Sequence, residues 1–280
     1  TFPAVRFKTS LGLATSDDGI NWTVSEQAIF DSKNLLSDDE IKRLYDPRIT
    51  VIDGKPYLCM AMDTAHGVRG CIAEVDDTFE NFNIISASAP DNRNMVLFPE
   101  KVNGKYVRLE RPFPVYSRGG KDRFDLWLST SPDLVFWGET ELVLGVEDVP
   151  YANDKIGPAA PPIKTDKGWL TTFHAVDIDS KRRKHGWERA WKKRYCAGIM
   201  LLDLNERLDR KAYEGAKLYY KMEDYKASRV AFRNVLKDDA ENIYREDILY
   251  YIAMSSYKFA QNSIASKQKE RYLTFVDDYY

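Results

Sequence analysis

The sequence contains few of the side chains that bind metals or form disulfides. Its 280 residues include only 3 cysteines and 3 histidines. Cys59, Cys71 and Cys196 lie in or beside apolar runs, as buried free thiols do, and they show no metal-ligand spacing. The histidines form no H-x-E or H-x-x-H pattern. The sequence therefore favours neither a disulfide framework nor a zinc site, and we expect no metal and no organic cofactor.

The chain also lacks a long hydrophobic run and an excess of charge of either sign. No apolar stretch approaches the roughly 18 residues that span a bilayer, so we expect no membrane span. The first residues, T-F-P-A-V-R-F, lack the charged start and the long apolar stretch of a signal peptide. The net charge of -2 predicts neither nucleic-acid binding nor an acidic tail.

Two kinds of polar turn recur along the first 204 residues. The phrases S-D-D-G-I-N-W (16–22), D-D-T-F-E-N-F (76–82) and S-P-D-L-V-F-W (131–137) each end in an aromatic residue. Glycine turns between apolar strands recur at a similar interval of about 55 residues. Many short strands with repeated phrases favour a β-propeller, whose blades take about 40–50 residues. A β-sandwich is the competing all-β fold, but sandwiches rarely repeat such phrases.

After residue 204 the pattern becomes helical. Apolar or small residues recur at helical spacing over 212–236, and a second helical stretch covers about 246–280. The pair Ala227-Ser228 recurs as Ala265-Ser266, at a period close to that of tetratricopeptide repeats. The predicted domains are a β-propeller domain at 1–204 and a helical tetratricopeptide-like segment at 205–280.

A hairpin is predicted within 92–112, because Asn103-Gly104 separates two short apolar runs. Arg93 precedes the first run and Arg111 closes the second. In an antiparallel pair these ends lie side by side, so two guanidinium groups would meet at one rim of a sheet. Their planar forks suit a phosphate or a carboxylate. On this stretch alone, a pair of surface arginines is the simpler interpretation.

Three further polar residues stand at predicted strand ends. Asp46, in Y-D-P-R-I-T, precedes a proline and begins a turn, although capping that turn is the commoner role for such a residue. Lys155 precedes a proline-rich segment that fixes the backbone before the next hairpin. His174 ends an apolar strand, where a lone histidine is more often structural.

Together these residues supply one carboxylate and several cations from different repeats. A propeller gathers strand ends at the mouth of its central channel, and such a set favours displacement of a sugar by an anion. Phosphate is already a nucleophile, so the site needs one acid for the leaving oxygen and donors that hold the phosphate. An inverting hydrolase would need a second carboxylate about 6.5–9.5 Å from the first, for which Asp63 and Glu110 are the candidates.

Residues 1 to about 204 resemble glycoside hydrolase family 130, the inverting β-mannoside phosphorylases and related enzymes. The resemblance rests on Y-D-P-R-I-T (45–50), R-N-M-V-L-F-P-E-K-V-N-G-K-Y-V-R-L-E-R-P (93–112), K-I-G-P-A-A-P-P-I-K-T-D-K-G-W-L-T-T-F-H-A-V (155–176) and R-Y-C-A-G-I-M-L-L-D-L (194–204). It implies a five-bladed propeller with the site in its central cavity. It also implies phosphorolysis of β-1,4-mannosyl-glucose or β-manno-oligosaccharides to mannose 1-phosphate, with inorganic phosphate as co-substrate.

The resemblance assigns roles to individual residues. Asp46 falls on the family's acid, which acts through a sugar hydroxyl that relays the proton. Tyr45 would lie beside the mannosyl subsite, and Arg6 matches a sugar-binding arginine. The phosphate-binding positions correspond to Arg93, Asn94, Arg111, Lys155 and His174.

A basic segment, 181–194, contains Trp187 and Trp191. A basic run with two tryptophans would suit stacking on single-stranded nucleic acid, but charged runs on exposed loops are usually solvated. We prefer the hypothesis that the two tryptophans line a sugar acceptor subsite.

The second half departs from the family pattern. Because 204 residues hold fewer than four of the repeats, we expect an incomplete propeller. Residues 207–280 resemble the tetratricopeptide-like region of BamD-type outer-membrane assembly lipoproteins, through L-Y-Y-K-M-E-D-Y-K-A-S-R-V-A-F and L-Y-Y-I-A-M-S-S-Y-K-F-A. The first half implies a cytoplasmic location, whereas the second resembles periplasmic proteins, which suggests a chimeric chain. In the alternative hypothesis the helical segment is a non-catalytic scaffold that binds other proteins or a second copy of the chain.

Overall fold

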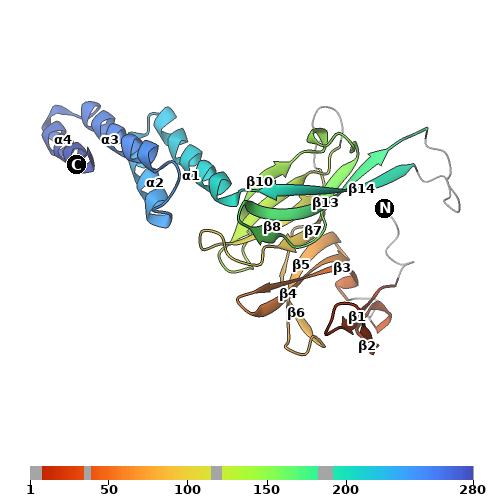
Figure 1. The fold of residues 1–280 in the computed structure, drawn as a ribbon. Coiled ribbons are helices and arrows are strands. Elements are labelled where there is room, and N and C mark those ends of the chain that lie inside the picture. Colours follow the sequence, from red (N-terminus) through yellow and green to blue (C-terminus); the bar gives the residue numbers. More distant parts are fainter. Residues whose placement is uncertain (1–7, 35–38, 115–121, 182–191, 280) are drawn as a thin grey trace. The chain divides into compact units, whose positions relative to one another are not determined.

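The computed structural model describes residues 8–34, 39–114, 122–181 and 192–279 (Figure 1). The chain divides into two compact units, Thr1–Leu202 and Asp203–Tyr280. The first unit is built of strands and the second of helices. None of the described helices is both long and apolar enough to cross a membrane.

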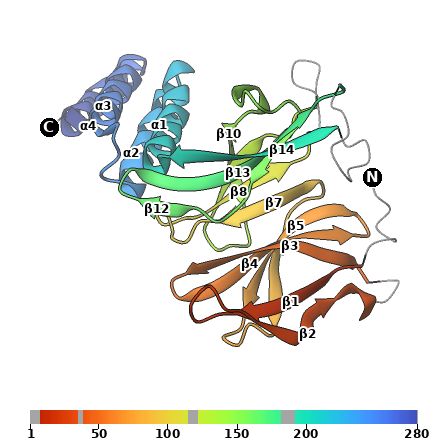
Figure 2. The ribbon, with the colours of Figure 1, turned by 45° about the vertical axis from the view of Figure 1, so that its right-hand side comes forward.

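Antiparallel sheets follow one another along the first unit (Figures 1 and 2). The first sheet pairs β1 (Ser10–Thr15) with β2 (Thr23–Asp31). The second has the order β3 (Ile41–Ile52), β4 (Lys55–Thr64), β5 (Gly67–Val75), β6 (Phe82–Ala87). The third has the order β10 (Gly138–Leu144), β9 (Leu126–Ser131), β8 (Tyr106–Pro112), β7 (Asn92–Leu97). In the fourth, β13 (Gly168–Ile178) pairs with β11 (Lys155–Pro158), β12 (Ile163–Thr165) and β14 (Lys193–Leu202). The described residues also include the short 3-10 helices η2 (Ser32–Asn34) and η3 (Val146–Asp148).

The turn predicted at Asn103-Gly104 is present and sets the register of β7 and β8. Asn103 and Gly104 have φ angles of 48° and 73°, so both lie in the left-handed region that a tight hairpin turn requires. Across this hairpin Arg93 is the register partner of Arg111. The prediction that the two arginines lie side by side is therefore confirmed.

The edge strands of the three four-stranded sheets come together. β3, β7 and β11 each lie at an edge of their sheet, and β7 contacts both β3 and β11. This arrangement brings together the strands that carry Asp46, Arg93 and Lys155, although more than 100 positions separate the first of these residues from the last.

A hydrophobic core fixes β7 against the second sheet. Met95 and Leu97 of β7 are buried against Cys59 and Ile72. Each such side chain contributes roughly 1.5–3 kcal/mol by leaving water. Gly70 makes the close approach possible, because a Cβ at this position would lie 2.5 Å from Met95 Cε. The cysteines are free, and Cys59 and Cys71 are buried thiols as predicted.

The second unit contains the helices α1 (Leu204–Lys221), α2 (Tyr225–Asp238), α3 (Arg245–Gln261) and α4 (Ala265–Tyr279). Aspartates begin the first two helices, because the side chain of Asp203 accepts a hydrogen bond from the backbone N–H of Glu206 and that of Asp224 from Ala227. A separate core of apolar and aromatic side chains holds the helices together. Its buried members are Tyr213, Ala216, Phe232, Ile248 and Ile252.

The predicted fold, an incomplete five-bladed-type propeller followed by a tetratricopeptide-like segment, is wrong. The described strands form three four-stranded sheets and one two-stranded sheet, a fold that is sandwich-like or propeller-like, in place of five blades. The two Ala-Ser pairs on which the helical period rested also differ in environment. Ser228 is buried and accepts a hydrogen bond from Ser255 Oγ at 3.0 Å, whereas Ala265 and Ser266 are exposed at the start of α4. The described helices therefore form no clear tetratricopeptide segment.

Candidate active site

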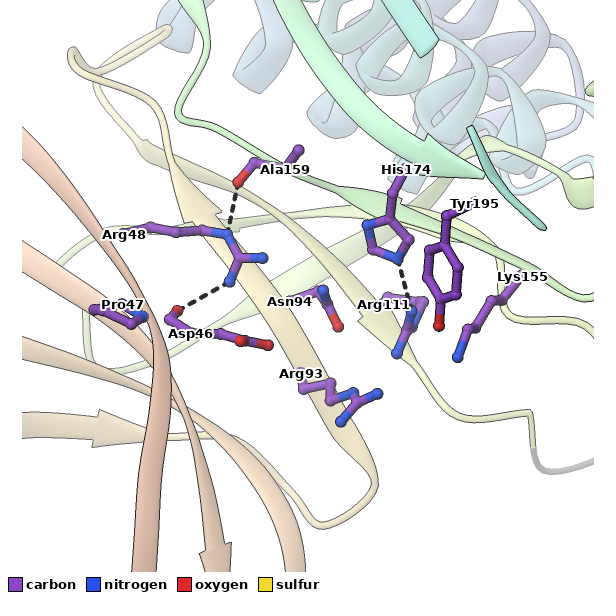
Figure 3. A pocket seen from close by; sticks show the side chains of 10 residues that line it. All are labelled: Asp46, Pro47, Arg48, Arg93, Asn94, Arg111, Lys155, Ala159, His174 and Tyr195. Carbon is purple, nitrogen blue, oxygen red and sulfur yellow. Dashed lines mark hydrogen bonds between the residues drawn. The ribbon is translucent and has the colours of Figure 1, made fainter. Parts of the chain in front are cut away.

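A polar hollow of about 460 Å³ is lined by the edge strands β3, β7 and β11 together with β8, β13 and β14 (Figure 3). Its volume lies within the range of about 300–1,000 Å³ that is usual for small-molecule sites. The residues that line it are Asp46, Pro47, Arg48, Arg93, Asn94, Arg111, Lys155, Ala159, His174 and Tyr195.

Asp46 reaches the pocket from a bulge in β3. Between the pairs that Tyr45 and Arg48 make with β4, β3 carries one more residue than its partner strand. Asp46 has a φ of 54°, in the left-handed region that Asp tolerates better than most residues. Pro47 suits the bulge because it has no N–H to leave unpaired. A bulge redirects the side chains of its strand, and the exposed carboxylate of Asp46 points into the pocket (Figure 3).

Asn94 occupies a second bulge of the same kind, in β7. Between the pairs that Arg93 and Val96 make with β8, β7 carries one extra residue, and Asn94 has a φ of 59°. The side chain is buried, and its Oδ1 has no hydrogen-bond partner within the described part of the chain. Because an amide can present either its oxygen or its NH₂ by rotating about χ2, Asn94 is available to a ligand in the pocket.

Arg111 is the most deeply buried cation of the pocket. Only 1% of its surface is exposed, and burial, with Arg93 nearby, lowers the pKa of its guanidinium to about 10. The guanidinium carbon lies 5.5 Å from the centre of the Phe124 ring, and Nη1 donates to His174 Nε2 at 3.2 Å. Over the residues that the structure describes, the Nε atoms of Arg93 and Arg111 are buried without a hydrogen-bond partner.

His174 is a neutral imidazole. Because a guanidinium only donates, Nε2 accepts from Arg111 and the ring hydrogen is on Nδ1. Burial first, and then the charges of Arg111 and Lys155, lower the pKa of His174 to about 4. Gly157 of β11 is the register partner of His174, and a Cβ at Gly157 would lie 2.8 Å from His174 Cε1. Glycine at this position therefore leaves room for the imidazole to reach Arg111.

Lys155, at the start of β11, is a half-buried cation. Burial, followed by the charges of Lys193 and Arg111, lowers the pKa of its ammonium to about 8. Its Nζ lies 5.8 Å from the centre of the Tyr195 ring, and that ring is 6.3 Å from the ring of His174. Tyr195 thus stands beside both groups at the β14 side of the pocket (Figure 3).

The lining of the pocket has an excess of positive charge. Four cations, Arg48, Arg93, Arg111 and Lys155, face one carboxylate, Asp46. In the described ranges, the ion pairs include none of these four cations. A buried cation outside an ion pair is costly, so the arrangement favours a bound anion.

The two candidates for a second carboxylate are occupied elsewhere. Asp63 accepts from Arg43 Nε at 2.7 Å and from Tyr45 Oη at 2.9 Å. Glu110 accepts from Asn92 Nδ2 at 2.7 Å and forms an ion pair with Arg108 at 2.8 Å. Neither carboxylate lines the pocket. Outside the undescribed segments, no group of three or more His, Cys, Asp or Glu side chains gathers as a metal site would.

The pocket brings together the predicted acid, Asp46, and all of the predicted phosphate-binding residues. The predicted mannosyl-site residue Tyr45 lies outside the lining, where its hydroxyl contacts Asp63 and Arg93. The remaining sugar-binding predictions, Arg6, Trp187 and Trp191, lie outside the described residues.

Sequence reasoning missed two polar lining residues, Arg48 and Tyr195. Arg48 stands in the same phrase as Asp46, and its charge was the available signal. Tyr195 is opposite Val176 in the β13–β14 register, a pairing that the sequence could not give because the connection falls in a long polar segment.

Sequence comparison places this chain in a known family. A family model described as beta-1,4-mannooligosaccharide phosphorylase, of glycoside hydrolase family 130, matches residues 5–223. The chain is 31% identical over 195 residues to a beta-1,2-mannobiose phosphorylase of Listeria innocua, which covers 69% of this chain and 49% of the relative. It is 36% identical over 168 residues to a beta-1,4-mannooligosaccharide phosphorylase of Ruminococcus albus, which covers 58% of this chain and 48% of the relative.

Comparison with solved structures finds the same family as comparison of sequences. The solved beta-1,2-mannobiose phosphorylase of Listeria innocua, in complex with beta-1,2-mannobiose, matches with a TM-score of 0.55 and 29% identity over 70% of this chain and 50% of that one. The chain thus spans about half the length of these relatives.

The comparisons also bear on two predictions about the second half. The family match continues to residue 223, through the junction predicted at 204–207 and through α1. The comparisons therefore support neither a chimeric chain nor the resemblance to BamD-type lipoproteins. On the family match and on relatives at 31% and 36% identity, the chain belongs to glycoside hydrolase family 130, the family of the β-mannoside phosphorylases.

Proposed function

We propose that the chain catalyses phosphorolysis of β-mannosides, in which a mannosyl unit passes to inorganic phosphate to give mannose 1-phosphate. The observation that supports this most directly is the deeply buried Arg111, which stands with Arg93 and Lys155 in a pocket that has one carboxylate. Removing an unpaired cation from water costs several kcal/mol, and a bound anion offsets that cost. Phosphate presents oxygens on several sides and so suits donors that arrive from β7, β8 and β11.

The proposed reaction is a single displacement. A phosphate oxygen attacks C1 of the mannosyl unit from the face opposite the leaving group, and the bond between C1 and the glycosidic oxygen breaks. The leaving oxygen takes a proton that originates on the Asp46 carboxyl group and passes through a sugar hydroxyl, as the family resemblance implies. The proton of the hydrogen phosphate then returns to Asp46. Because the attack inverts C1, a β-mannoside gives the α-anomer of mannose 1-phosphate.

The remaining residues would hold the phosphate and its partners. Arg93, Arg111 and Lys155 supply the positive charge, and the amide of Asn94 supplies a further hydrogen bond. His174 is neutral and accepts from Arg111, so it orients that guanidinium and adds no charge of its own. No base is needed, because the nucleophile is already an anion.

The substrate class is β-mannosides, and the linkage is open between β-1,2 and β-1,4. The relatives include a beta-1,2-mannobiose phosphorylase and a beta-1,4-mannooligosaccharide phosphorylase at similar identity. The pocket residues described above would contact phosphate and the scissile bond, which both linkages share.

The test is to incubate the protein with β-1,4-mannosyl-glucose, β-1,4-mannobiose and β-1,2-mannobiose, with and without inorganic phosphate, and to follow mannose 1-phosphate. We expect product from at least one substrate, and only when phosphate is present. Release of free mannose at the same rate without phosphate would show hydrolysis and contradict the proposal.

Asp46→Asn should lower the rate of phosphorolysis by about 10²–10⁴-fold, because the side chain no longer carries an acidic proton. Calorimetric titration should find the phosphate affinity retained. The matched control is Asp53→Asn, since Asp53 is also an aspartate in the left-handed region, with a φ of 51°, but stands in the β3–β4 turn outside the pocket. Equal activity of the two variants would remove Asp46 from the mechanism.

A further inference from the structure

Arg48 joins the bulge that carries Asp46 to a different sheet. Its Nη1 donates to the backbone carbonyl of Asp46 at 3.1 Å, and its Nε donates to the backbone carbonyl of Ala159 at 2.7 Å (Figure 3). Asp46 belongs to β3, whereas Ala159 directly follows β11, the strand of Lys155. One guanidinium thus connects the strand of the acid with the strand of a phosphate-binding cation.

The bulge at Asp46 explains why a stabilising contact is needed at this point. Asp46 stands where the β3–β4 register skips a residue, and it has a left-handed φ of 54°. A non-glycine residue in that region is strained, and it persists only when its surroundings fix it. Arg48 supplies the donor that a carbonyl at a bulge loses from its sheet. Burial lowers the pKa of the Arg48 guanidinium, and the charge of the nearby Asp46 carboxylate opposes that shift.

We propose that Arg48 is a positioning residue that fixes the distance between the Asp46 carboxyl group and the phosphate-binding cations. The proposal rests on the proposed function, and it assigns Arg48 to the backbone of the acid and not to the phosphate. The fork of the guanidinium is what the role requires, because its two N–H groups point to two different carbonyls. A lysine ammonium keeps the charge but cannot span both carbonyls in this way.

The variants Arg48→Lys and Arg48→Met test whether the role of Arg48 depends on its planar guanidinium or only on its positive charge. Both should lower kcat on a mannobiose by about 100-fold, as expected when a reacting group is misplaced by about 1 Å. Phosphate affinity, measured by calorimetric titration, should change by less than about threefold, since Arg48 is not used for the anion. Arg69→Met is the matched control, because Arg69 also donates to a backbone carbonyl, that of Ser88 at 2.6 Å, but lies outside the pocket.

A leaving-group series shows whether the defect acts through the acid. An aryl leaving group such as 4-nitrophenolate departs without protonation, so a misplaced acid matters less. With 4-nitrophenyl β-mannoside the two variants should therefore lose less than about fivefold, against about 100-fold with the sugar leaving group. A purely structural defect would lower both rates equally.

Hydrogen exchange tests the connection without catalysis. In Arg48→Met, amide exchange should rise in peptides that cover 44–50 and remain unchanged in peptides of the first sheet.

Full activity of Arg48→Lys, or a loss of phosphate affinity that matches the loss of kcat, would overturn the proposal. If the wild-type protein makes no mannose 1-phosphate, the proposed function is wrong. The exchange measurement then decides the role of Arg48, and unchanged exchange at 44–50 would overturn it.

Discussion

Lys155 is the cation of the pocket whose charge depends on pH in the neutral to alkaline range. Its pKa is lowered to about 8, chiefly by burial and then by Lys193 and Arg111, so the ammonium loses its proton as the pH rises through 8. Arg111 keeps its charge there, because its pKa is lowered only to about 10. His174 contributes no change, since its pKa of about 4 leaves it neutral throughout.

We therefore predict that phosphate affinity falls as the pH rises from about 7 to about 9, by about tenfold, because deprotonation of Lys155 removes one charge from the site. Arg111, with a pKa of about 10, stays largely protonated in that range. In Lys155→Arg the guanidinium remains charged, so the affinity should be nearly constant over the same range. Calorimetric titrations at several pH values check this. The same decline in wild type and Lys155→Arg would mean that another group titrates.

At the level of single residues, the sequence predicts much of this pocket. Asp46, Arg93, Asn94, Arg111, Lys155 and His174 share the pocket, and their roles in catalysis and phosphate binding stay predictions. The pairing of the two arginines followed from a local cause, the Asn103-Gly104 turn, which fixes the register of one hairpin. The contact of Arg48 with Ala159 crosses between sheets, so no local pattern could reveal it.

At the scale of elements, two β-bulges determine where side chains of the site point. Each adds one residue to an edge strand, at Asp46 in β3 and at Asn94 in β7, and each puts that residue in the left-handed region. An apolar run in a sequence predicts a strand but not an extra residue within it, because the skipped register depends on the partner strand. The sequence therefore predicts the strands of the site better than the directions of their side chains.

Asn94 allows the backbone and side-chain roles of a bulge to be separated. Asn94→Gly and Asn94→Ala both remove the amide, so both should weaken phosphate binding by about tenfold, the value of one hydrogen bond to an anion. Glycine adopts a φ of 59° without strain, whereas alanine does not. The free energy of unfolding of Asn94→Gly should therefore be about 1 kcal/mol larger than that of Asn94→Ala.

Isothermal titration and urea denaturation measure the two quantities. Wild-type affinity in Asn94→Gly would show that the amide makes no contact with phosphate. Much weaker binding in Asn94→Ala than in Asn94→Gly would instead show that the shape of the bulge, and not its side chain, holds the anion.

For the whole molecule, a β half followed by helices could be predicted, but the number of blades and the helical repeat could not. Repeated phrases mark turns, and turns recur in any fold of short antiparallel strands. The spacing of the turns therefore does not give the number of sheets. Small residues at a fixed interval indicate a helical repeat only if they pack alike. Ser228 is buried and Ser266 is exposed, so the interval in this chain has no structural equivalent.

The division into two compact units predicts that phosphate stabilises only one of them. The pocket lies wholly within Thr1–Leu202, and the helical unit has a core of its own, with Phe232 and Ile248 fully buried. A ligand that binds only the folded state adds about 2.7 kcal/mol to its stability at a concentration of 100 times its Kd.

Scanning calorimetry should thus resolve two transitions. Phosphate should raise the midpoint temperature of the transition that coincides with the loss of the β-sheet circular dichroism signal. The helical transition should stay in place and serve as an internal reference, and Lys155→Met should reduce the phosphate-dependent shift. A single transition that moves as a whole would show that the sheets and the helices unfold as one cooperative structure.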